Sequence, residues 1–229
     1  MESDKTAISV LGLPIPGDAA NNIVIKAWQL LKQDFPFLPP VHFYLLKNIP
    51  AGAGLGAGSA NGAYALTALN QKFHLDLSQQ QLINYALQLG SDCPFFILNK
   101  PVLARGRGEI FESVPIDLSG CQLVIVNPGI HISTAWAFSQ LTPASPLFDL
   151  RKSINKPVAE WKDFISNHFE QAVSRAHPEI ADIKKQLYQS GAIFATMSGS
   201  GSTVYGLFPK DIQLNLNFPD NYFKRMIVL

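Results

Sequence analysis

The hydrophobic and polar positions of the first part of the chain predict a strand, a helix and a second strand. Residues 6–11 and 41–47 form apolar runs typical of strands. The second run is apolar at alternating and intervening positions, so we expect both of its faces to be well covered. Between them, apolar residues recur at helical spacing up to about Lys32, after a cap at Asn21 or Asn22.

The next elements are marked mainly by their end signals. A helix to about Phe73 follows a glycine-rich stretch, and a second helix begins where Ser78 and Gln81 have capping-box spacing and stops at Gly90. The apolar residues 95–97 are expected to begin a buried strand. A strand pair is expected over residues 102–111, around a glycine-rich turn.

The pattern restarts at Cys121, which predicts a domain boundary near residues 113–121 and domains over 1–117 and 118–229. A short helix is expected after a cap at Ser133 or Thr134. The other expected elements of this half are strands at 122–127, 193–197, 204–208 and 223–229, and helices at 158–166, 167–176 and 178–189. Because strands and helices mix without strict alternation, an α+β fold is predicted in preference to a doubly wound one.

Composition narrows the classes of function. The 229 residues are 47% hydrophobic and carry a net charge of +1, so the chain can form a core and lacks the basic surplus of a non-specific nucleic-acid binder. Cys93 and Cys121 have no CxxC spacing and are expected to be reduced thiols. The five histidines form no HxxxH or HxH pair, which argues against a structural metal site. No signal peptide or spanning segment is recognisable, so a cytoplasmic protein without membrane partners is predicted.

A glycine-rich loop before the first long helix carries the strongest chemical signal. Alternating glycines allow backbone N–H groups to converge on an anion, and the helix that follows adds its positive end. Ser59 could cap this helix or contact a phosphate oxygen. A flexible linker is the alternative, and it is disfavoured because a strand and an amphipathic helix flank the loop. The loop matches neither GxxxxGK[ST] nor GxGxxG, so a different phosphate loop is predicted. Its residues are Pro50, Ala51, Gly52, Ala53, Gly54, Leu55, Gly56, Ala57, Gly58, Ser59 and Ala60.

Three other features are candidates for the same site as this loop. Residues 197–202 form a second glycine-rich turn, for which a tight hairpin is an equally good interpretation. Asp92 lies at a rigid corner and could accept a hydroxyl proton, although a turn-capping role is the stronger interpretation from spacing alone. Lys47 could meet phosphate or adenine, or it could be an ordinary solvated strand end.

Residues 47–59, KNIPAGAGLGAGS, closely resemble the second motif of the GHMP kinase superfamily. Other stretches resemble one branch of it, whose substrate is a cytidine-diphosphate-linked sugar alcohol of isoprenoid precursor synthesis. These stretches are residues 89–96, 105–109, 127–129 with Ser133 and Thr134, and 197–202 with 204–206. The resemblance implies an N-terminal domain like domain 2 of ribosomal protein S5 and a ferredoxin-like C-terminal domain.

The resemblance also implies a reaction and its residues. ATP, with Mg²⁺ carried by the nucleotide, would phosphorylate the 2-hydroxyl of the methylerythritol unit, and the protein would be a monomer or weak homodimer. Asp92 matches the catalytic aspartate, Phe138 would stack on cytosine, and Thr134 would also bind substrate. The implied nucleotide-binding residues are 50–60, with Asn22 and Lys47 near the nucleoside, and Gly199, Ser200 and Gly201.

The chain departs from the family pattern in two ways. Ala60 stands where a second hydroxyl donor is usual, and Gly62 weakens the helix start by roughly 1 kcal/mol. The family's first strands, with an N-A-K motif that supplies a catalytic lysine, are not found in the sequence. Three interpretations therefore stay open: an active kinase of this branch, an impaired nucleotide-binding fragment or relative, and a kinase for another alcohol such as homoserine or mevalonate.

Overall fold

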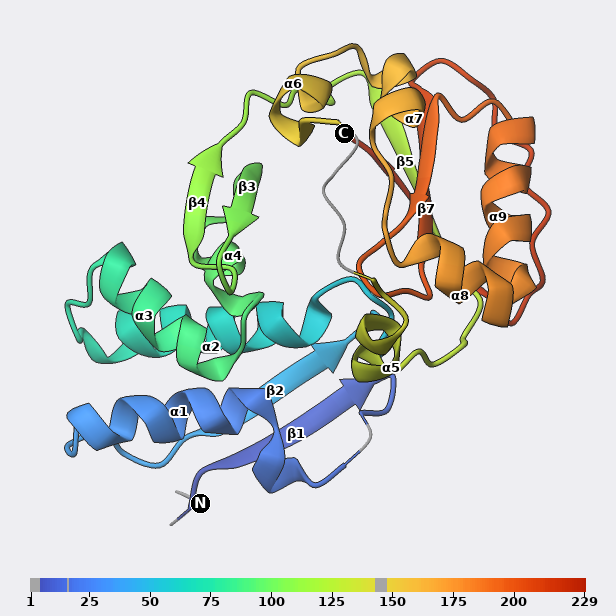
Figure 1. Ribbon diagram of the computed structural model, residues 1–229. Helices are drawn as coiled ribbons and strands as arrows, with labels where there is room; N and C mark the ends of the chain where they lie inside the picture. The colour runs from blue at the N-terminus through green and yellow to red at the C-terminus, as the bar shows by residue number, and fades with distance from the viewer. Residues whose placement is uncertain (1–4, 16, 143–147) are drawn as a thin grey trace. The chain divides into compact units, whose positions relative to one another are not determined.

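The computed structural model describes residues 5–15, 17–142 and 148–229, and it divides into two compact units (Figure 1). The first unit comprises Met1–Ala51 and Gly56–Ser113, and the second comprises Gly52–Leu55 and Val114–Leu229. Four residues of the glycine-rich loop therefore belong to the second unit, although the chain on both sides of them belongs to the first.

The first unit packs helices on one face of a parallel pair of strands. Apolar side chains of both strands and of the first three α-helices form one core, with Leu31 and Leu66 fully buried. The strands pair in register from Ala7 opposite His42 to Gly12 opposite Lys47. The elements are β1 (Ala7–Gly12), η1 (Ala19–Asn21), α1 (Ile23–Asp34), β2 (His42–Lys47), α2 (Ala57–Phe73), α3 (Gln79–Leu89), α4 (Cys93–Leu98), and the antiparallel hairpin β3 (Val102–Arg105) and β4 (Ile110–Ser113).

The other face of this two-stranded sheet is open, so the expectation that both faces of β2 are covered is wrong for the described part of the chain. Successive side chains of a strand point to opposite faces. Phe43 and Leu45 pack against the core, whereas Tyr44 and Leu46 are 74% and 63% exposed. The apolar run indicated hydrophobicity at every position but could not indicate which elements lie beside the strand.

Residues 95–97 belong to helix α4 and not to a strand, which corrects the prediction for this stretch. Pro94 occupies the first turn of the helix, where its fixed φ favours helical backbone and its missing N–H removes no hydrogen bond. A short apolar run does not by itself distinguish a strand from a buried helix. The capping signals were more reliable: the side chain of Asn22 accepts a hydrogen bond from Val24 N at 3.0 Å, and Ser78 forms the expected capping box.

The second unit is built on a four-stranded antiparallel sheet of order β6-β7-β5-β8. This order and the succession of strands agree with the predicted ferredoxin-like arrangement. Residues 210–222 form no helix, so the second helix of that pattern is absent. The strands are β5 (Cys121–Asn127), β6 (Phe194–Met197), β7 (Val204–Pro209) and β8 (Phe223–Val228).

Helices cover both faces of this sheet. Phe208 and Met197 contribute to a core with α8 and α9, while Phe194 and Leu207 point to the opposite face and pack with Trp161. The prediction for α9 is confirmed, but the helix expected over 158–166 is split into two short helices, and the one expected from 167 begins at Glu170. The helices are α5 (Thr134–Ser139), α6 (Leu150–Ile154), η2 (Val158–Glu160), α7 (Trp161–Phe164), α8 (Glu170–Ala176) and α9 (Pro178–Gln189).

Replacing Ser78 by alanine is expected to lower the free energy of unfolding by about 1 kcal/mol. The substitution removes the acceptor of Gln81 N and the hydrogen bond that the Ser78 hydroxyl donates to Gln81 Oε1, while the bond from Ser78 N to Gln81 Oε1 remains. Urea unfolding followed by circular dichroism measures the change. Ser119→Ala is the matched control, because its hydroxyl contacts Asp117 in an exposed turn and its loss should change stability by less than about 0.5 kcal/mol. Equal losses in the two variants would contradict the capping role.

Candidate functional site

The glycine-rich loop takes a backbone path that requires glycine. Gly52, Gly54 and Gly56 have φ values of 68°, 76° and 65°, in the left-handed region that side chains disfavour. Gly56 is the N-cap of α2, and among the described residues no side chain caps this helix end. The prediction that Ser59 could cap the helix is therefore wrong. Its hydroxyl instead lies near the thiol of Cys93 and acts to lower the pKa of that thiol. Because Gly56 offers no side-chain cap, the first N–H groups of α2 remain available to an anion.

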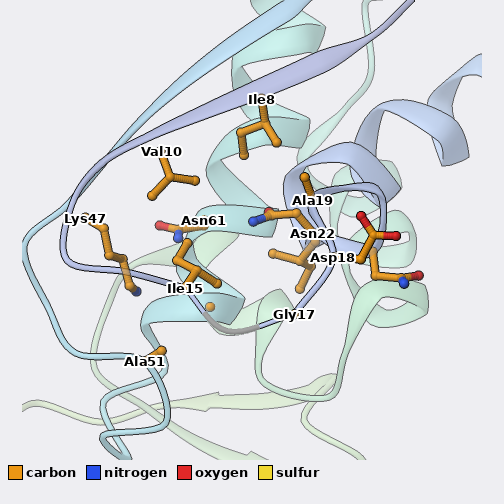
Figure 2. A pocket seen from close by; sticks show the side chains of 13 residues that line it. Ile8, Val10, Ile15, Gly17, Asp18, Ala19, Asn22, Lys47, Ala51 and Asn61 are labelled. Carbon is orange, nitrogen blue, oxygen red and sulfur yellow. The ribbon is translucent and has the colours of Figure 1, made fainter.

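A pocket of about 300 Å³ lies in the first unit beside this helix start (Figure 2). It brings together four residues predicted to bind nucleotide, namely Lys47, Asn22, Ala51 and Gly58. Figure 2 shows the Lys47 side chain on one side of the pocket and Asn22 on the other. The rest of the lining is mixed, with apolar side chains from Ile8, Val10, Ile15 and Ile23 and polar ones from Asp18, Asn21 and Asn61. A pocket that combines an apolar lining with some polar groups is typical of a small-ligand site.

Lys47 is a buried lysine with no counter-ion in the part of the chain that the structure describes. Its side chain is only 5% exposed at the end of β2, so it is not an ordinary solvated strand end. Loss of hydration disfavours the ammonium form and lowers the pKa of Lys47 below its ordinary value. Among the described residues, no carboxylate or hydrogen-bond acceptor pairs with its Nζ. An anionic ligand would relieve this cost by supplying the missing charge.

Asn61 is a pocket residue that the sequence patterns do not single out. It lies on α2 three residues after Gly58, and both line the pocket because residues at this spacing share a helix face. The spacing from Gly58 could therefore have predicted that Asn61 lies on the same side of the helix as the loop residues that face a ligand. In Asn22, which also lines the pocket, the Oδ1 atom already accepts a hydrogen bond as the cap of α1.

Asp92 occupies the N-cap position of α4 but makes no capping hydrogen bond. The turn-cap interpretation is therefore wrong, and its exposed carboxylate has no hydrogen-bond or ion-pair partner in the described part of the chain. Next to it, Cys93 is fully buried. Burial raises the pKa of the Cys93 thiol, and the nearby Asp92 charge adds to this, while the Ser59 hydroxyl opposes it. The carboxylate is thus the accessible proton acceptor at this corner.

The hairpin of β3 and β4 supports the corner that presents Asp92. A Cβ at Gly108 would lie 2.0 Å from the carbonyl oxygen of Ser91, so only glycine allows this close approach. Glu109 Oε2 accepts a hydrogen bond from Arg107 N at 2.7 Å and fixes the turn. The Arg-Gly-Arg-Gly-Glu sequence therefore packs its turn directly against the residue that precedes Asp92.

In the second unit, the two glycine-rich loops are in contact. Ser198 Oγ donates a hydrogen bond to Gly54 O at 2.8 Å, and Thr203 N donates to Ala53 O at 3.2 Å. A Cβ at Gly54 would lie 2.5 Å from Ser198 O and 2.6 Å from Gly201 O. The turn between β6 and β7 is a tight hairpin, which agrees with one of the two interpretations of residues 197–202. It also hydrogen-bonds the first loop.

The predicted substrate residues lie on α5 of the second unit. Thr134 Oγ1 lies 3.2 Å from Ser200 Oγ, which joins α5 to the second loop. Phe138 is 60% exposed, and its ring packs edge-on against Phe169 with centroids 4.9 Å apart. It lines an open groove of about 1510 Å³ along α8 and α9. Gly199 and Gly201 have φ values of 56° and 94°, so the second loop also needs glycine.

The described residues contain no group of three or more histidine, cysteine, aspartate or glutamate side chains that could hold a metal ion. Cys93 and Cys121 are both free thiols. In the same part of the chain, no helix is long and apolar enough to cross a membrane.

Comparisons with known proteins point to one family. Residues 22–100 match the model of the GHMP kinases N terminal domain, and residues 150–216 match that of the GHMP kinases C terminal domain. A protein of Bacteroides fragilis named 4-diphosphocytidyl-2-C-methyl-D-erythritol kinase is 52% identical over 204 residues. The match covers 89% of this chain and 74% of that relative.

Solved structures agree with these matches. The crystal structure of 4-(cytidine 5'-diphospho)-2C-methyl-D-erythritol kinase aligns with a TM-score of 0.73 at 26% identity, over 89% of this chain and 73% of that one. Homoserine kinase from Cytophaga hutchinsonii has the same fold, with a TM-score of 0.66 at 20% identity over 92% and 75% of the two chains. The α+β fold predicted from the sequence is confirmed.

Two glycine substitutions in the same loop are expected to have opposite effects on stability. Gly54→Ala forces a side chain into left-handed backbone and against two carbonyl oxygens, and should lower the free energy of unfolding by at least about 2 kcal/mol. At Gly58, inside α2, no atom lies within 4 Å of the position that a Cβ would take, so Gly58→Ala should raise it by about 0.5–1 kcal/mol. Urea unfolding measures both. A Gly54→Ala protein as stable as the wild type would contradict the loop geometry.

Proposed function

The chain belongs to the GHMP kinase family, and we propose that it transfers the terminal phosphoryl group of ATP to the 2-hydroxyl of 4-diphosphocytidyl-2-C-methyl-D-erythritol, in non-mevalonate isoprenoid precursor synthesis. The observation that carries this proposal is the 52% identity over 89% of the chain to a protein of that name. The geometry supports it independently, because a glycine loop opens an uncapped helix beside a pocket lined by apolar and polar side chains.

In this proposal the nucleoside of ATP occupies the pocket in the first unit, between its apolar side chains and Asn22. The phosphates extend along residues 50–60, where the free N–H groups of α2 and the positive helix end favour negative charge. Lys47 supplies a cation that has no other partner in the described residues. Gly199, Ser200 and Gly201 add backbone and hydroxyl donors.

We further propose that Mg²⁺ arrives bound to the phosphates. The described residues offer no cluster of carboxylates as a ready-made cage. Magnesium commonly binds through substrate phosphates with few protein ligands and several waters. When bound, the ion would neutralise charge on the phosphates. The residues of the loop, 50–60, would hold the phosphates that carry the ion.

Asp92 has the role of orienting the alcohol and accepting its proton. Its carboxylate is exposed and unpaired among the described residues, so it can hydrogen-bond a substrate hydroxyl. As the hydroxyl oxygen forms its bond to the γ-phosphorus, the bond from that phosphorus to the bridging oxygen of ADP breaks and the hydroxyl proton passes to Asp92. Phe138 offers an exposed aromatic face for the cytosine ring, and Thr134 a hydroxyl for the same substrate.

Asp92→Asn is expected to lower kcat by about 100-fold to 10,000-fold while the KM for ATP stays close to the wild-type value. The amide keeps the shape and can still hydrogen-bond, but it does not accept the proton. A coupled assay of ADP formation with the natural full-length protein measures the rate, and ³¹P spectroscopy identifies the phosphorylated product. Asp182→Asn, an exposed carboxylate on α9, is the matched control and should behave like the wild type.

The same assay separates the other interpretations. Homoserine and mevalonate, offered in parallel, should react much more slowly than the diphosphocytidyl alcohol. Preference for either one would replace the proposed substrate. ATP binding without transfer to any of the three would favour the nucleotide-binding interpretation over a kinase.

Lys47→Met is expected to weaken ATP binding at least about tenfold, because a charge-assisted contact is lost. In the absence of nucleotide the same variant should be more stable than the wild type, since it removes a desolvated ammonium. Folding lowers the pKa of Lys47, so burying its ammonium form costs stability. This cost is full at pH values below the pKa of the folded state and fades as the pH rises to 10.5, above which the lysine is neutral in both states.

Calorimetry measures the affinity, and urea unfolding between pH 7 and about pH 10 measures the stability difference, which should shrink as pH rises. Lys26→Met, an exposed lysine on α1, is the control for loss of a lysine charge and should change neither quantity by much. A Lys47→Met protein that binds ATP like the wild type would contradict the assigned role.

A further inference from the structure

We propose that Thr203 is a positioning residue for the ATP loop, residues 50–60. It holds the carbonyl oxygen of Ala53 so that the N–H groups of Gly54 and Leu55 point away from the second glycine-rich loop. This inference rests on the proposed kinase function. Thr203 is completely buried immediately before β7, at the end of the second glycine loop, so it reaches a ligand only through the residues it holds.

Two donors of one residue converge on one carbonyl. The hydroxyl of Thr203 donates to Ala53 O at 2.5 Å, and its backbone N–H donates to the same oxygen at 3.2 Å. Ser198 Oγ fixes the following carbonyl, that of Gly54, at 2.8 Å. Two successive peptide units of the loop are therefore anchored through their oxygens.

Anchoring an oxygen also sets the direction of a hydrogen. In a planar trans peptide, the C=O and the next residue's N–H point in opposite directions. When Ala53 O and Gly54 O point into the second unit, the N–H groups of Gly54 and Leu55 point away from their anchors. No acceptor within the described residues takes either N–H. Such paired N–H groups are suited to an anion.

The direction of the Thr203 hydroxyl is itself fixed. Asn127, only 2% exposed, donates from Nδ2 to Thr203 Oγ1 at 2.9 Å and to Ser202 Oγ at 3.0 Å. Because a hydroxyl has one hydrogen, an oxygen that already accepts from Asn127 gives its own hydrogen to Ala53 O. The Thr203 hydroxyl thus has one orientation, fixed by both of its hydrogen bonds. A threonine that only filled space would not need such a fixed orientation.

Thr203→Val tests this inference, because it keeps the side-chain shape and the backbone N–H but removes the hydroxyl. The KM for ATP, and the dissociation constant of ATP measured by calorimetry, should rise about fivefold to tenfold. The KM for the alcohol should be unchanged. Thr203→Ser, which restores the hydroxyl, should return both ATP constants to within about twofold of the wild type.

Thr196→Val is the matched control. Thr196 is a buried threonine of β6 in the same sheet, 7% exposed, and its hydroxyl faces Glu170 Oε1 at 3.4 Å and not the loop. It should alter stability without altering either ATP constant. A general loss of packing would instead affect both valine variants alike and would not be reversed by serine.

Wild-type ATP constants in Thr203→Val, equal effects of the two valine variants, or no rescue by Thr203→Ser would each overturn the inference. Calorimetry separates it from the kinase proposal. If the wild type binds ATP but transfers no phosphoryl group, the kinase proposal fails, and the binding constants of the variants still decide the role of Thr203. If the wild type does not bind ATP at all, both fail.

Discussion

The carbonyl oxygens of Ala53 and Gly54 are the point on which the candidate site depends. The loop that contains them leaves the first unit, contributes four residues to the second and returns to begin α2. A glycine-rich segment has more conformational freedom to lose than any other, so its order must come from outside contacts. Hydrogen bonds from Ser198 and Thr203 supply that order, and they act on oxygens so that the N–H groups remain available.

The same anchor extends towards the substrate side of the second unit. Asn127, which orients Thr203, also accepts a hydrogen bond from Gly129 N at 2.9 Å, and Ser202 donates to Ile130 O. This segment leads into α5, which carries Thr134. One buried amide therefore ties the ATP loop to the chain that presents the predicted alcohol-binding residues, through contacts that all lie within one unit.

Local signals in the sequence predicted much of this architecture. The glycine loops and the caps at Asn22 and Ser78 are encoded by a few adjacent residues, and they could be identified without knowing what packs beside them. The helical state of residues 95–97 and the open face of β2 could not, since both depend on tertiary neighbours. For the same reason, the burial of Lys47 could not be predicted from the sequence, whereas the spacing of Asn61 from Gly58 on α2 did offer a signal for its place in the pocket.

Several features of the site are unfavourable for the protein alone. As far as the structure describes the chain, Lys47 is desolvated and has no counter-ion, and α2 has no side-chain cap at its start. Asp92 stands at the start of α4 without using the backbone donors there. Each departs from what a sequence optimised for stability would place at that position. A polyphosphate nucleotide would satisfy the first two together, because it is anionic and accepts hydrogen bonds. The free Asp92 carboxylate needs a donor instead, which an alcohol provides. The stabilising interactions missing from the chain are thus those that the two substrates of a kinase would bring.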